Sequence, residues 1–227
     1  MLATPLSFIR TTLEDALVGL IKPWASLAVL FMGLASLGCN ATTLLGMDID
    51  DIAREAELIF EGTVLVTEAR QESNSGIINT YVTFQISDVI KGDYDADSIE
   101  LKFMGGTFNG EVVAVSGLTI PQPGERGVYF VESLNRDLIN PLLGWSQGHF
   151  LIVDEAGTSR ISTVDSEPVT AVDSVTNIPS VIKKPQAIIQ ERNAVAAGVT
   201  TESSSLLIER ALTVDEFKVR IRELLAN

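Results

Sequence analysis

The chain has 227 residues, and its 30 Asp and Glu against 16 Lys and Arg give a formal net charge of −14. This acidity disfavours nucleic acid and anionic membranes as partners, because both are recognised through basic surfaces. The single cysteine, Cys39, excludes an internal disulfide, and the single histidine, His149, excludes a zinc site built from several His and Cys ligands. Basic peptides, cationic proteins or calcium suit the charge better, although the simplest interpretation of the charge is solubility.

An apolar run near the start of the chain predicts export. Residues 24–38, WASLAVLFMGLASLG, carry no charge and follow Lys22. A membrane span needs about 20 residues, so this shorter run fits the hydrophobic region of a signal peptide, with Arg10 and Lys22 as its positive flank. We expect residues 1–41 to be the signal peptide and the mature protein to lie in the periplasm or outside the cell.

Two processing routes fit this leader. Small residues at Cys39 and Ala41 suit cleavage before Thr42, which is the route that we prefer. Residues 36–39 also resemble a lipobox, in which Cys39 would be acylated and the protein tethered to a membrane as a lipoprotein. Cleavage before Thr42 leaves no cysteine, so the mature domain would be held by its apolar core, as suits a bacterial periplasm.

Residues 42–162 predict a short helix followed by a small β-barrel or sandwich. Asp48 can cap a helix to Glu57 with Ile49, Ile52, Ala53 and Ala56 on one face. The apolar period then changes to two, which indicates strands separated by Gly-containing and Pro-containing turns, one of them at Asn109–Gly110 and the last at 154–157. The expected same-face sets are Leu58, Phe60, Val64 and Val66; Val82, Phe84 and Ile86; Ile99, Leu101 and Phe103; and Val128 with Phe130.

The remainder of the chain has a different character. Residues 163–208 are rich in Ser, Thr, Asp and Val without a sustained period, which predicts an extended or partly disordered stretch. Residues 209–227 predict a helix, because Thr213 and Glu216 form a capping box. We expect its apolar stripe to pack on the barrel; the stripe is Val214, Phe217, Ile221, Leu224 and Leu225.

Three segments resemble the opening strands of netrin-like, TIMP-like modules: EAELIFEGTVLVTEA, TYVTFQISDVIKGD and DSIELKF. The match covers about residues 48–160 and implies a five-stranded, OB-type β-barrel. The chain also resembles bacterial exported proteins of unknown function that carry a GWSQG-like strand start. By analogy the resemblance implies modulation of a secreted protease, but TIMP-like inhibitors use cysteines at the mature N-terminus, and a chain starting at Thr42 has none.

The segment GWSQGHF contains the spacing of a serine-hydrolase nucleophile elbow, Gly144, Ser146 and Gly148. An elbow needs a strand before the serine and a helix after it. Here a loop-like stretch precedes Ser146 and the strand-like HFLIVD follows it, and the sole base, His149, would point to the opposite face of that strand. We therefore expect no catalytic residue, with a hydrolase using Ser146 as the disfavoured alternative. Instead, Trp145, Gln147 and His149 are candidates for a ligand surface at the mouth of the barrel, and packing of Trp145 and Phe150 is the simpler interpretation.

Asp93, Asp95 and Asp97 resemble the start of a calcium loop. The sixth and twelfth positions hold Ser98 and Met104 where an EF-hand needs Gly and Glu. An acidic turn between strands is the simpler interpretation, so these residues are only weak calcium candidates, and we expect no cofactor. The sequence as a whole predicts an exported, non-catalytic protein that binds an unidentified protein or small ligand, not nucleic acid, and contacts a membrane only if Cys39 is lipidated.

Overall fold

The computed structural model describes residues 43–175, 187–189 and 195–226, all within a unit that spans residues 41–227. The expected signal peptide and its processing residues Cys39, Ala41 and Thr42 lie outside the described residues. In the part of the chain that is described, no helix is both long enough and apolar enough to cross a membrane.

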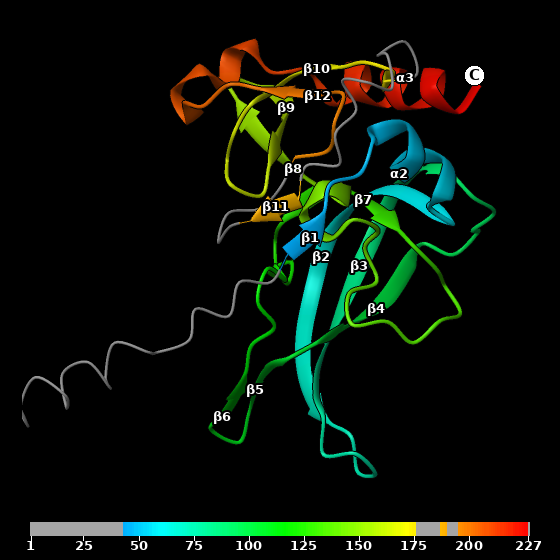
Figure 1. The fold of residues 1–227 in the computed structure, drawn as a ribbon, viewed down its shortest axis with the longest axis vertical. Helices are drawn as coiled ribbons and strands as arrows, with labels where there is room; N and C mark the ends of the chain where they lie inside the picture. Colours follow the sequence, from blue (N-terminus) through cyan, green and yellow to red (C-terminus); the bar gives the residue numbers. More distant parts are fainter. Residues whose placement is uncertain (1–42, 176–186, 190–194, 227) are drawn as a thin grey trace, which may run out of the picture. The chain divides into compact units, whose positions relative to one another are not determined.

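A six-stranded antiparallel sheet forms the centre of the fold, in the order β4-β3-β2-β7-β8-β9 (Figure 1). Its ends, β4 and β9, do not pair with each other within the described residues, so the sheet is open. β8 pairs with β7 along one edge and with β9 along the other, so it has no free edge with which to close a barrel. The expected mainly β domain is thus confirmed, whereas a closed barrel is not seen. The strands are β2 (Leu58–Gln71), β3 (Ile78–Lys91), β4 (Ser98–Met104), β7 (Arg126–Val131), β8 (His149–Glu155) and β9 (Thr158–Thr163).

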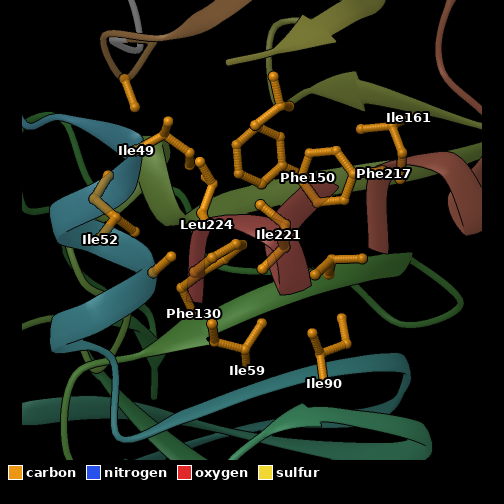
Figure 2. Packing of buried hydrophobic residues seen from close by; sticks show 14 of the residues in the cluster. Ile49, Ile52, Ile59, Ile90, Phe130, Phe150, Ile161, Phe217, Ile221 and Leu224 are labelled. Carbon is orange, nitrogen blue, oxygen red and sulfur yellow. The ribbon is translucent and has the colours of Figure 1, made fainter. Parts of the chain in front are cut away.

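Two apolar cores lie against this sheet, because successive side chains of a strand point to opposite faces. In β2, Ile59 belongs to the core that also contains residues of α2 (Ile49–Glu55) and α3 (Val214–Ala226), called here the helix-side core. Leu58 and Phe60 belong to the core on the other face of the sheet, with Phe84 and Phe103 of β3 and β4, called here the hairpin-side core. In the helix-side core, α2 and α3 pack on the sheet. Figure 2 shows this core with its residues from both helices and the sheet; those labelled are Ile49, Ile52, Ile59, Ile90, Phe130, Phe150, Ile161, Phe217, Ile221 and Leu224.

Helix α2 has the predicted apolar face, with Ile49, Ile52, Ala53 and Ala56 all buried. Asp48 occupies the N-cap position, but its side chain makes no capping hydrogen bond, contrary to the prediction. The other end of the helix is capped from β3.

Lys91 donates from Nζ to the carbonyl oxygens of Ala53 (2.9 Å) and Arg54 (2.5 Å), which places a cation at the negative end of α2. Burial lowers the pKa of Lys91. The next residue, Gly92, has φ +101°, and a Cβ there would lie 2.7 Å from the Glu57 carbonyl oxygen. The turn at Lys91 and Gly92 therefore holds α2 against the end of β3.

Helix α3 confirms the predicted capping box. The Glu216 carboxylate accepts from the Thr213 backbone N–H at 2.8 Å, and the Thr213 hydroxyl accepts from the Glu216 N–H at 3.3 Å. Both bonds to Thr213, first the backbone and then the hydroxyl one, lower the pKa of Glu216. The predicted apolar stripe is buried in the helix-side core, with Leu225 at its margin.

Part of the stretch expected to be extended or disordered is built into the fold. Two short antiparallel strands form there, β10 (Val169–Val172) and β12 (Val199–Thr201), followed by the 3-10 helix η3 (Ser205–Arg210). The register shifts between Val169 and Ala171, so Val169 and Val172 both enter the helix-side core although they are three residues apart. This irregularity explains why no period of two is visible. A further pair joins β1 (Thr43–Leu45) to β11 (Ala187–Ile189).

The strands β2 and β3 run past β7, which pairs only with Leu58–Thr63 of β2 (Figure 1). A register shift between Val64 and Val66 marks this point. Val66 is 51% exposed, so its expected place on the face of Phe60 is wrong, because the bulge reverses the alternation. Nearby, β5 (Gly106–Phe108) and β6 (Glu111–Val113) form the predicted hairpin at Asn109–Gly110, both with positive φ.

Candidate functional site

The GWSQG segment forms a tight turn that leads into β8. Trp145–Gly148 is a 3-10 helix, η1, and Trp145 has φ +60°. A Cβ on Gly148 would lie 2.2 Å from the Leu143 carbonyl oxygen, so only glycine fits there. The predicted strand after the serine is confirmed and begins at His149, after the η1 turn. Ser146 and His149 therefore do not share a strand, and the opposite-face argument made from the sequence does not apply to them.

Gln147 is built into the interior rather than facing solvent, at 1% exposure. Its Oε1 accepts from the backbone N–H of Met47 at 2.8 Å, and its Nε2 donates to the Gly144 carbonyl at 3.1 Å. The side chain thus ties Met47, two residues before α2, to the η1 turn. Ser146 is also buried, at 7% exposure, and Trp145 is partly exposed.

His149 belongs to a buried polar cluster with Glu125 and Tyr129. The His149 Nε2 lies 2.7 Å from Glu125 Oε1, and the Tyr129 hydroxyl donates to the same oxygen at 3.0 Å. The His149 and Tyr129 rings contact each other at 5.1 Å between centroids. Burial and then the Glu125 carboxylate raise the pKa of Tyr129 well above its usual value.

This cluster joins β7, β8 and the link before β7. The Glu125 carbonyl accepts from the Val64 N–H at 2.8 Å, which fixes that link against β2. His149 is 1% and Tyr129 0% exposed, so only the Glu125 carboxylate, at 19%, reaches the surface. A carboxylate that orients an imidazole can serve proton transfer, but here it also satisfies two buried groups. Nothing near residue 149 in the sequence points to Glu125, 24 positions earlier.

The three ligand-surface candidates are therefore brought together in one turn, with Gln147 and His149 engaged in internal hydrogen bonds. A ligand-binding role for them remains a prediction, and Trp145 is the member with an exposed part.

Asp93, Asp95 and Asp97 lie exposed in the link between β3 and β4, as the acidic-turn interpretation expects. Among the residues that the structure describes, no group of three or more His, Cys, Asp or Glu side chains is placed to hold a metal ion.

Strand β4 lies at one end of the sheet and pairs only with β3 in the described chain. The Ile86 N–H donates to the Asp97 carbonyl at 2.8 Å, so these two residues form a hydrogen-bonded pair. Bonded and non-bonded pairs alternate along antiparallel strands. The other bonded pairs are consequently Phe84–Ile99, Val82–Leu101 and Thr80–Phe103.

The residues of β4 that alternate with the bonded ones, Glu100, Lys102 and Met104 among them, point their backbone N–H and C=O groups away from β3. Met104 confirms this, because its N–H donates to the Ile139 carbonyl outside the sheet at 2.9 Å. The backbone groups of Glu100 and Lys102 point in the same direction as those of Met104. In the described chain no hydrogen bond reaches their backbone N–H or C=O groups. The middle of β4 thus presents an open strand edge, called here the β4 edge (Glu100 and Lys102).

A polar hollow of about 410 Å³ lies between the β8–β9 turn and α3. Within it the Lys218 ammonium, 13% exposed, bonds to Glu61 at 2.8 Å and to Asp88 at 3.2 Å. Burial lowers the pKa of Lys218, but the two carboxylates outweigh burial and leave the pKa above its usual value. These ion pairs anchor α3 on β2 and β3 and leave the ammonium committed to the protein.

Comparison with known proteins adds no assignment: no protein-family model matches the chain, and neither a curated protein nor a solved structure matches it.

Proposed function

We propose that this is an exported, non-catalytic binding protein whose partner adds a strand to the β4 edge. The observation that carries the proposal is the open backbone at Glu100 and Lys102 in the middle of a seven-residue strand. Unpaired strand edges template the addition of another strand, and proteins that do not use such an edge cover or distort it.

The two ends of the sheet differ in this respect. At the opposite end, the Ile161 N–H of β9 donates to the Leu212 carbonyl at 2.9 Å, so the segment before α3 covers that strand. At β4 the segment around Ile139 covers Met104 by a bond of the same kind, and in the described chain Glu100 and Lys102 are left uncovered. The inward side chains of β4, Ile99 and Leu101, are 6% and 5% exposed, so the core holds the strand and its open edge in place.

The export signal and the OB-type barrel belong to the same proposal. The apolar leader with its positive flank supports export. The run β4-β3-β2-β7-β8, centred on the long and bulged β2, supports a relation to five-stranded, partly open barrels. The buried groups around GWSQG bond to one another, which supports a structural role for that turn.

The test uses the purified protein and three nine-residue peptides with alternating threonine, TKTKTKTKT, TSTSTSTST and TETETETET, each blocked at both ends. We expect at least one to shift the backbone amide resonances of Glu100 and Lys102. A Glu100→Pro variant removes one outward N–H at an edge position that tolerates proline, and it should abolish binding, whereas the matched Glu100→Thr variant should retain it. No response to any of the three peptides would overturn the proposed function.

A further inference from the structure

We propose that the strand received at the β4 edge is an extended basic segment of a partner protein, with Lys or Arg at alternate positions. This inference rests on the proposed function and names the chemistry of the partner.

Carboxylates surround the β4 edge. Asp93, Asp95 and Asp97 lie exposed in the link that leads into β4, and no ion pair joins them to a cation within the described residues. Glu100, 45% exposed, lies on the strand itself, and Asp137, 77% exposed, pairs with Lys102 of the strand. The surface along the edge therefore carries more carboxylates than cations, and those of the link before β4 have no cation beside them in the described chain.

The one cation on β4 does not offset this charge. Lys102 is paired with Asp137 and, at 3.3 Å, with Glu72. Both hydrogen bonds outweigh partial burial and raise the pKa of Lys102, so its charge is matched inside the chain. The Glu100 carboxylate has a looser partner, because Arg70 lies 3.3 Å from it and only 2.6 Å from Glu68.

The spacing of a strand fixes where the partner's charges would lie. Side chains on an added strand alternate between the two faces, and those on one face stand about 4.5–5.5 Å from their cross-strand neighbours. Cations at every second position would share the face of Glu100, while small or β-branched residues between them would lie next to Ile99 and Leu101 at the margin of the hairpin-side core. The net charge of −14 would further steer a basic segment to the protein.

A second copy of the chain is a poorer occupant. Pairing two β4 edges would bring the acidic links and Asp137 of both copies close together, and like charges across a strand pair are destabilising. The charge of the edge therefore selects a cationic partner over self-association.

The peptide series separates this inference from the proposed function. We expect TKTKTKTKT to bind about tenfold or more tightly than TSTSTSTST, and TETETETET to bind more weakly than both. A variant with Asp93→Asn, Asp95→Asn and Asp97→Asn should weaken the basic peptide about tenfold and leave the neutral peptide unchanged.

The matched control neutralises three exposed acids away from the β4 edge, Glu55→Gln, Glu111→Gln and Glu209→Gln, and changes the net charge equally. It should leave the affinity for the basic peptide near that of the unmodified protein. Equal weakening by both triple variants would show a general charge effect and overturn the inference. Equal affinity for all three peptides, still lost in Glu100→Pro, would overturn the inference while supporting the proposed function.

Discussion

Replacing Phe217 with alanine tests whether α3 is part of the core. Phe217 is 0% exposed, and its ring lies 4.9 Å from that of Phe150, which in turn contacts Phe130 at 5.8 Å. Truncating a buried phenylalanine costs about 3–5 kcal/mol through lost transfer energy and the cavity left behind. Because a domain has only about 5–15 kcal/mol of stability, this change should remove a large share of it.

The assay is urea unfolding followed by circular dichroism, with the slope m used to check that both proteins unfold in the same way. The control is Val219→Ala on the same helix, where the side chain is 51% exposed and the expected change is within about 0.5 kcal/mol. A loss below about 1 kcal/mol for Phe217→Ala, or a loss equal to that of the control, would refute the packing of α3 against β8.

Three further predictions follow from local geometry and processing. Gly148→Ala should lower the melting temperature more than Gly157→Ala. At Gly148 the new Cβ meets the Leu143 carbonyl oxygen at 2.2 Å, whereas at Gly157 it meets nothing within 4 Å and the cost is the backbone strain of φ +80°. The reverse order would contradict the η1 geometry. Glu216 should titrate below the usual glutamate pKa in carbon-13 NMR, so its stabilising effect is present above about pH 4.3 and is lost as the pH falls through the folded-state pKa. Thr213→Ala should raise that pKa and cost about 1 kcal/mol, and an unchanged Glu216 titration would argue against the capping box. The intact mass of the protein from its native envelope should equal that of a chain that starts at Thr42. A mass that matches a chain starting at an acylated Cys39 would establish the lipoprotein route instead.

Regular periodicity allowed much of the fold to be predicted from the sequence. The α2 face, the sets in β3 and β4, the Asn109–Gly110 turn and the capped α3 all follow from local patterns of period 3.6 or 2. These elements are specified by residues close together in the chain, and so they can be recognised without knowing the tertiary structure.

Irregular strands and distant partners escaped prediction. Bulges move Val66 out of its expected face and bring Val169 and Val172 onto one face, and a bulge leaves no periodic signal. Asp48 had the right residue type for a cap, but the side chain does not make the bond. Glu125 could not be predicted as a partner of His149, because only the fold places its carboxylate beside the imidazole.

The β4 edge could not be inferred from the sequence either. The alternation in SIELKFM shows which side chains are buried, but it does not show which strand lies on each side. Only the sheet order shows that β4 is terminal and that the link with Asp93, Asp95 and Asp97 leads into a terminal strand.

Residue-resolved amide hydrogen exchange along β4 tests the central claim most directly. The amides of Ile99, Leu101 and Phe103 bond to β3 and should exchange slowly, whereas those of Glu100 and Lys102 should exchange rapidly in the free protein. Addition of TKTKTKTKT should slow the exchange of the Glu100 and Lys102 amides. Slow exchange at Glu100 and Lys102 before any peptide is added would mean that the edge is already covered, and would contradict the account.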